Sequence, residues 1–212
     1  AEVFMPRSRI PSSASNADTI MRLQTAAASD RAAGLNQTHS ARVLVVCYSR
    51  KGENYAPGGT EVLEIGHTAK MAQLISALTG GDLYEIQTEK NYPANYRETT
   101  RIAEDELRRD EKPMLAGTLP DLSKYDLIFL GHPIWWGKLP PAVNSFLSAA
   151  NLSGKEVAHF CTHAGSGFGT SDRELRTRAP NAQFLESLSV VGTEVDRAKV
   201  QIENWVRRVL NR

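Results

Sequence analysis

Short apolar runs alternate with segments of helical periodicity along most of the chain. The runs are β-branched or apolar throughout, which is typical of strands buried on both faces of a parallel sheet. The segments between them place apolar residues on one side at helical spacing. The strands are expected at residues 43–47, 82–87, 125–131, 156–161 and 184–191, and the helices at residues 67–79, 95–110, from 140 onwards, 171–178 and 195–210.

This β-α alternation predicts an α/β fold, a doubly wound five-stranded parallel sheet with helices on both faces and the strand order 2-1-3-4-5. Residues 41–212 form this domain, whereas residues 1–40 are rich in Ser, Ala and polar groups and are expected to form a tail or a loosely docked helix. Residues 53–65 interrupt the alternation, and we expect a long inserted loop there.

Composition and charge remove several classes of function. The chain has 212 residues and a formal net charge of +1; its first 40 residues carry four basic and three acidic groups, which leaves 21 of each sign in the rest. Such a balance has no basic stripe, so nucleic acid is not an expected partner. No apolar run is long enough to span a membrane, and we expect no metal site. Cys47 and Cys161 lie in apolar runs and read as buried free thiols. A cytoplasmic protein is expected, although export of a longer precursor stays open.

Three strand-to-helix loops carry the candidate chemistry, and in a parallel sheet they open at the same edge. The first begins Ser49-Arg50 and ends Gly66-His67-Thr68 at a helix start, where free N–H groups suit a phosphate, although simple helix capping by Thr68 explains it equally well. The second, Pro133-Ile134-Trp135-Trp136-Gly137, places two Trp side by side. The third, residues 162–169, is rich in Gly and offers Thr, His and Ser side chains.

Competing motifs do not match. The stretch from Gly52 to Thr60 lacks the Lys of a phosphate-binding P-loop, and Thr170 stands where a dinucleotide fingerprint needs Gly. Ser166 lacks the flanking glycines of a nucleophile elbow, because Ala164 and Phe168 occupy those positions.

The motifs VLVVCYSRKGENY, GHT, NYPANY, YDLIFLGHPIWWGKLPPAV and FCTHAGSGFG, in this order and spacing, resemble the flavodoxins, and within them a bacterial flavodoxin-like subfamily. The resemblance covers residues 42–210 and implies a flavodoxin-like fold with FMN across the sheet edge. It implies a phosphate held by Ser49, Arg50, His67 and Thr68, an isoalloxazine ring lined by Pro133, Ile134, Trp135, Trp136 and Gly137, and a second side closed by Thr162, His163, Gly165, Ser166 and Gly169.

The chain departs from the family pattern in two ways. Residues 53–65 are inserted between the halves of the phosphate loop, and His67 replaces the usual Asn, which makes that contact pH-sensitive. We expect Gly137 to be free to turn its peptide group toward the flavin N5 atom, so Gly137→Val should narrow the gap between the two one-electron potentials.

Two functions are consistent with such a site. The first is an electron carrier that passes electrons through FMN to a redox partner protein. The alternative is an NAD(P)H-dependent FMN reductase of quinones or similar small acceptors, in which Tyr55 or His163 is the candidate proton donor. The flavin itself is the redox centre in both cases, and the protein is expected to be a monomer or a homodimer.

Overall fold

Strand β1 (Val43–Cys47) lies at the centre of the fold, and all five of its residues are buried. The structure is a computed structural model that describes residues 41–212, so the tail or docked helix expected at residues 1–40 lies outside the described residues. β1 pairs in parallel with β4 (Asp82–Glu85) on one side and with β5 (Leu127–Pro133) on the other. A strand paired on both sides and covered on both faces has no position for a polar side chain, which explains the unbroken VLVVC run.

The sheet continues from β5 to β6 (Glu156–His163), and β6 pairs in parallel with both β7 (Gln183–Phe184) and β8 (Leu188–Val191). The order β4-β1-β5-β6-β7 is therefore the expected 2-1-3-4-5 order, and the doubly wound parallel fold is confirmed. The expected last strand is divided in two pieces. Between them the Glu186 carbonyl leaves the ladder and accepts a hydrogen bond from Trp205 Nε1 at 3.0 Å.

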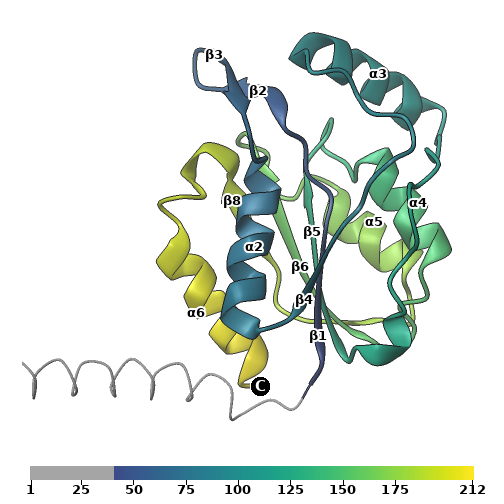
Figure 1. Cartoon of the computed structure of the whole chain (residues 1–212), viewed down its shortest axis with the longest axis vertical. Coiled ribbons are helices and arrows are strands. Elements are labelled where there is room, and N and C mark those ends of the chain that lie inside the picture. The colour runs from purple at the N-terminus through teal and green to yellow at the C-terminus, as the bar shows by residue number, and fades with distance from the viewer. Residues whose placement is uncertain (1–40) are drawn as a thin grey trace, which may run out of the picture. The chain divides into compact units, whose positions relative to one another are not determined.

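Helices cover both faces of the sheet (Figure 1). Helices α2 (His67–Thr79) and α6 (Lys199–Leu210) pack on one face, and α4 (Pro141–Ala149) and α5 (Ser171–Arg178) pack on the other. The alternation along β1 decides which residues meet which layer, because successive side chains of a strand point to opposite faces. Val43, Val45 and Cys47 join the α2/α6 core, whereas Leu44 and Val46 join the α4 core.

The expected loop at residues 53–65 is instead a β-hairpin. Strands β2 (Gly52–Ala56) and β3 (Gly59–Leu63) pair antiparallel, with Tyr55 opposite Thr60. Pro57 and Gly58 make the turn, and Gly58 has a φ of 84°, as the second central residue of a type II turn requires. The turn dipeptide Pro-Gly was the missed signal. The hairpin and helix α3 (Tyr96–Arg108) stand together above the edge of the sheet at which the strands end (Figure 1).

Among residues 41–212, no helix is long and apolar enough to cross a bilayer. Within the same range, no group of three or more His, Cys, Asp or Glu side chains is arranged to hold a metal ion.

Candidate functional site

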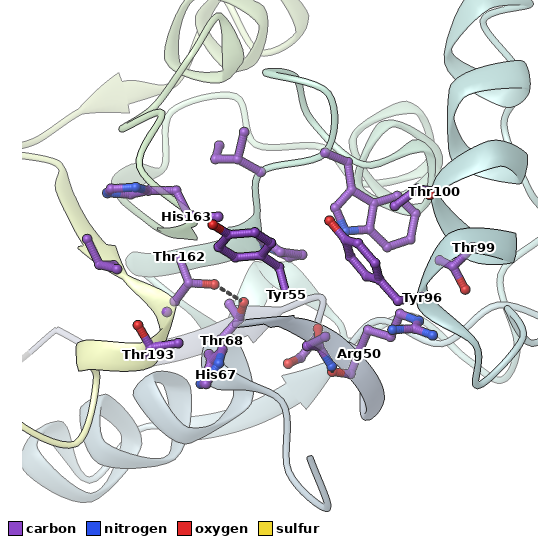
Figure 2. Close-up of a pocket in the computed structure, with 18 of the residues that line it drawn as sticks. Arg50, Tyr55, His67, Thr68, Tyr96, Thr99, Thr100, Thr162, His163 and Thr193 are labelled. Carbon is purple, nitrogen blue, oxygen red and sulfur yellow. Dashed lines mark hydrogen bonds between the residues drawn. The ribbon is translucent and has the colours of Figure 1, made fainter. Parts of the chain in front are cut away.

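A cavity of about 500 Å³ opens at the carboxyl ends of the strands, and residues of the hairpin and of α3 also line it (Figure 2). This volume falls within the roughly 300–1,000 Å³ typical of small-molecule sites. Most of the residues that the sequence assigned to a site come together here: the cavity is lined by Ser49, Arg50, Tyr55, His67, Thr68, Pro133, Ile134, Trp135, Trp136, Thr162 and His163.

The start of helix α2 forms one end of the cavity. Gly66 is the N-cap residue, and a Cβ atom there would lie 2.3 Å from Ser49 Oγ, so only glycine allows the two segments to approach. Ser49 Oγ accepts a hydrogen bond from the Ala69 N–H at 3.0 Å. The N–H groups of His67 and Thr68 belong to the first turn and have no acceptor within the helix. Together with the positive end of the helix dipole, they make this end of the cavity suited to an anion.

His67 also meets a carboxylate from the hairpin. Its Nε2 atom lies 3.1 Å from Glu61 Oε1. Burial lowers the pKa of His67, and the nearby Glu61 partly opposes that effect. A phosphate bound beside the ring would compete with Glu61 for it and would favour the protonated imidazole.

Arg50 lines the cavity, but its guanidinium is engaged elsewhere. Its Nη2 atom donates to the carbonyls of Pro93 at 2.6 Å and Ala94 at 2.7 Å, and its Nη1 atom donates to the carbonyl of Glu53. Figure 2 shows Arg50 beside Tyr96 rather than beside His67. The side chain therefore ties the first loop to the segment that leads into α3, a role that the sequence did not indicate.

The two Trp residues differ sharply in environment. Trp135 lies between Tyr48 and Tyr92, edge-on to both rings at 5.5 Å and 5.0 Å between centroids. Trp136 keeps 57% of its surface exposed, and its Nε1 atom donates to the Thr100 carbonyl of α3 at 2.9 Å.

A tight turn produces this difference. The Trp135 and Lys138 backbones exchange two hydrogen bonds, and the residues between them, Trp136 and Gly137, have φ values of 51° and 73°. Positive φ at both central positions defines a type I′ turn, which Trp adopts only at a cost. The turn lifts the Trp136 ring out of the core and into the mouth of the cavity.

The third loop contributes fewer cavity residues than expected. Thr162 and His163 line the cavity, and Thr162 Oγ1 lies 2.7 Å from Thr68 Oγ1, which joins this loop to α2 (Figure 2). His163 Nδ1 accepts a hydrogen bond from the Gly165 N–H at 2.9 Å, so the neutral ring carries its proton on Nε2. Burial lowers the pKa of His163, which favours that neutral ring.

Four of the predicted residues, Gly137, Gly165, Ser166 and Gly169, do not line the cavity. The Gly137 carbonyl accepts hydrogen bonds from Thr170 N at 2.7 Å and from Thr170 Oγ1 at 3.1 Å. A Cβ atom on Gly169 would lie 2.2 Å from that same carbonyl oxygen. These glycines lock the second and third loops together. The sequence had suggested that the Gly137 peptide is free to turn. In the structure Thr170 holds it in place.

Other lining residues were missed. Helix α3 turns the ring of Tyr96 into the cavity, close to the ring of Tyr55, the hairpin residue that the sequence had named as a candidate (Figure 2). The sequence could have indicated some of the missed residues. Tyr96 lies in the aromatic segment NYPANY, and the loop after β8 lies at the sheet edge where every parallel strand ends. The lining residues that the sequence did not assign are Asn54, Pro57, Tyr96, Thr99, Thr100, Ala103, Ala164, Val191, Gly192 and Thr193.

Comparison with known proteins follows this geometry. A family model described as Flavodoxin matches residues 63–209. A protein from Bacteroides uniformis, provisionally named a flavoprotein, is similar at 26% identity over 79% of this chain and 98% of its own, with a TM-score of 0.65. A second such protein, from Bacteroides eggerthii, is similar at 25% identity over 77% and 98%, with a TM-score of 0.58.

A flavoprotein from Lactobacillus acidophilus, solved in complex with FMN, is similar in fold at 23% identity over 74% of this chain and 98% of its own, with a TM-score of 0.57. No match was found among curated proteins.

Proposed function

Because the chain belongs to the flavodoxin family, we propose that it binds FMN in the cavity at the sheet edge and transfers electrons through it. Family membership supports FMN as the cofactor, and the Lactobacillus acidophilus flavoprotein was solved with FMN bound. One observation carries the proposal. A single cavity joins the start of α2, suited to a phosphate, to an exposed Trp136 ring, suited to a flat heterocycle.

In this proposal, side chains at one end of the cavity bind the phosphate and those at the other end contact the flavin ring. Ser49, His67 and Thr68 hold the phosphate at the start of α2, with Arg50 fixing the loop around it. Trp136 offers a ring to stack on, and Thr162 and His163 close the opposite side. Bound FMN would supply one- and two-electron transfer. Of the remaining predicted residues, Gly137 and Gly169 hold the second and third loops together, whereas Gly165 and Ser166 are exposed outside the cavity.

The first candidate role is that of a carrier that docks on redox partner proteins. The neutral charge of residues 41–212 argues that docking relies on shape and apolar contact, because electrostatic steering needs an excess of one charge.

The second candidate is an NAD(P)H-dependent FMN reductase of quinones or similar acceptors. The hairpin and α3 favour it, because they place two further aromatic rings, Tyr55 and Tyr96, beside the three loops. Such rings suit a second flat ligand. Of the two predicted candidates, His163 is the better placed to donate a hydrogen bond to the acceptor, since Nδ1 accepts from the Gly165 N–H and the proton lies on Nε2.

One experiment separates these functions. The purified protein is examined for flavin absorbance, loaded with FMN if colourless, and mixed anaerobically with NADH or NADPH and a quinone. Rapid bleaching by the nicotinamide supports the reductase, and bleaching only through a separate reductase supports the carrier. A protein that binds no added FMN would contradict both.

A further inference from the structure

Two buried histidines face each other on the adjacent strands β5 and β6, and one of them directly precedes Pro133, which lines the cavity. His132 and His159 are both 0% exposed, and their Nε2 atoms lie 2.7 Å apart. At the outer ends of this pair, His132 Nδ1 lies 2.9 Å from the Pro133 carbonyl oxygen, and His159 Nδ1 lies 3.3 Å from Asp172 Oδ1. The four groups therefore form a continuous chain of three contacts.

The three contacts need more protons than two neutral imidazole rings supply. A carbonyl and an ionised carboxylate only accept hydrogen bonds, so each outer contact needs a proton on the histidine Nδ1. The central contact between the two Nε2 atoms needs one more. Two neutral imidazoles carry two protons in total, so every choice of tautomers leaves at least one of the three contacts without a proton between its two atoms. The chain has a place for a third proton.

The surroundings keep that third proton away at rest. Burial, followed by the neighbouring His159, lowers the pKa of His132 to about 3. Burial also lowers the pKa of His159, while Asp172 opposes that change and Arg176 adds to it. An additional negative charge nearby would shift this balance, because it favours the protonated form.

Few other charges face the pair. Helix α5 contributes Asp172 and Arg176, which pair with each other at 2.9 Å. From β6 comes the Cys161 thiol, whose pKa burial raises to about 12, so it stays neutral. Helix α4 has no charged residue. Glu174 is engaged by Leu139 N at 3.3 Å and by the Thr170 hydroxyl.

The row of contacts from Asp172 to Pro133 ends at the wall of the proposed flavin site. Pro133, whose carbonyl is its last acceptor, lines the cavity, and so does Thr162 of the adjacent strand. We infer that His132, His159 and Asp172 form a proton-binding site that takes up one proton when bound FMN is reduced. The inference rests on the proposed function, because it needs a flavin in the cavity.

The proton and the electrons follow separate routes. The electrons would come from NAD(P)H or from a reduced partner protein, and none of them would pass to the histidines. The proton comes from solvent at Asp172, whose side chain is 33% exposed, and is relayed through His159 to His132 by proton transfer along the existing contacts. The product is an imidazole–imidazolium pair next to the Asp172 carboxylate, in which all three contacts hold a proton. The added positive charge offsets the charge that reduction places on the flavin.

The direct test is an NMR titration of the protein with ¹³C-labelled histidine, in the presence of oxidised FMN and again after anaerobic reduction. Spectra of His132→Gln and His159→Gln identify the pair. We expect the pKa of the pair to lie below about 6 with oxidised FMN and above about 8 after reduction, which is a rise in proton affinity of more than about 100-fold. An unchanged titration with bound and reduced FMN overturns this inference alone. A protein that quenches no FMN fluorescence overturns both this inference and the proposed function.

A second measurement follows the midpoint potential of FMN between pH 6 and pH 8. In Asp172→Asn the imidazolium loses its carboxylate. The slope of the midpoint potential against pH should therefore fall by the amount that corresponds to about one fewer proton taken up per two electrons. The matched control is Asp126→Asn, which removes a carboxylate at the opposite edge of the sheet, where it accepts from the Arg42 N–H. Its slope should equal that of the unmodified protein. Equal slopes for all three proteins would contradict a proton site at Asp172.

Discussion

Trp136 at the cavity and Trp205 in the core show how one residue type serves two purposes. Trp136 is 57% exposed at the cavity, whereas Trp205 is 0% exposed between the rings of Phe129 and Phe160. Replacing Trp136 by Ala removes a stacking partner, which contributes about 0.5–1.5 kcal/mol, so the dissociation constant of FMN should rise about 2- to 13-fold. Fluorescence quenching of FMN measures this change.

The controls separate binding from folding. Trp136→Phe retains a ring and should recover most of the affinity. Trp205→Ala should instead lower the free energy of unfolding by about 3–5 kcal/mol, while the folded protein binds FMN as before. Equal losses of affinity in Trp136→Ala and Trp205→Ala would contradict the assignment of Trp136 to the site.

His67 predicts a pH-dependent phosphate contact. Burial lowers the pKa of His67, and a bound phosphate would raise it, so the complex holds more protons than the free protein. FMN affinity should therefore rise as the pH falls. Because the phosphate itself titrates near pH 6, the quantity to compare is the ratio of FMN dissociation constants for His67→Asn and the unmodified protein. We expect this ratio to increase between pH 8 and pH 6, and a constant ratio would exclude a titrating contact.

At the scale of elements, the second and third loops form one unit. A Cβ atom on Gly169, where φ is 54°, would meet the Gly137 carbonyl. We expect Gly169→Ala to lower the free energy of unfolding by about 1–3 kcal/mol and to weaken FMN binding, because the Trp136 turn must shift. Gly154→Ala is the matched control, since Gly154 has a φ of 72° and open space around it, so only backbone strain is added. Equal effects in urea unfolding would show that the contact is unimportant.

Arg50 links two elements that the sheet does not hold. Its three bonds to the carbonyls of Glu53, Pro93 and Ala94 connect the hairpin to the start of α3. Arg50→Gln should therefore increase hydrogen exchange within Tyr96–Arg108 while the amides of β1 and β5 stay protected. Arg101→Gln, an exposed residue on the same helix, should leave α3 unchanged. Increased exchange in the central strands as well would indicate general destabilisation instead.

For the whole molecule, the sequence predicted the sheet because each central strand is an apolar run such as VLVVC. Such a run fits a strand that is buried on both faces at the centre of a sheet. The sequence also brought the three loops together, since parallel strands all end at one edge. It misplaced what depends on contacts between distant segments. The Arg50 guanidinium is turned by carbonyls more than 40 residues away, and Gly137 is fixed by Thr170. The His132–His159 contact joins two strands whose pairing register no local pattern reveals.

The buried His132–His159 pair should also make the free energy of unfolding depend on pH. Burial lowers the pKa of His132 to about 3 in the folded protein, against about 6.5 when unfolded. Between these values the unfolded chain binds more protons, so stability falls as the pH falls through this window. His132 alone should lower the free energy of unfolding by about 2 kcal/mol between pH 6.5 and pH 5. Asp172, whose pKa the His159 hydrogen bond depresses, adds a further loss only below about pH 4.

Urea unfolding at pH 7.5, 6.5 and 5.0 measures this acid limb. His132→Gln removes the buried titrating ring and keeps polar atoms for its neighbours, so it should flatten the decline between pH 6.5 and pH 5. His163→Gln replaces a half-buried ring and should change the slope much less. An acid limb equally steep in both variants would place the proton uptake of unfolding on groups other than the pair, and it would also remove the buried, neutral starting state from which reduction-linked protonation proceeds.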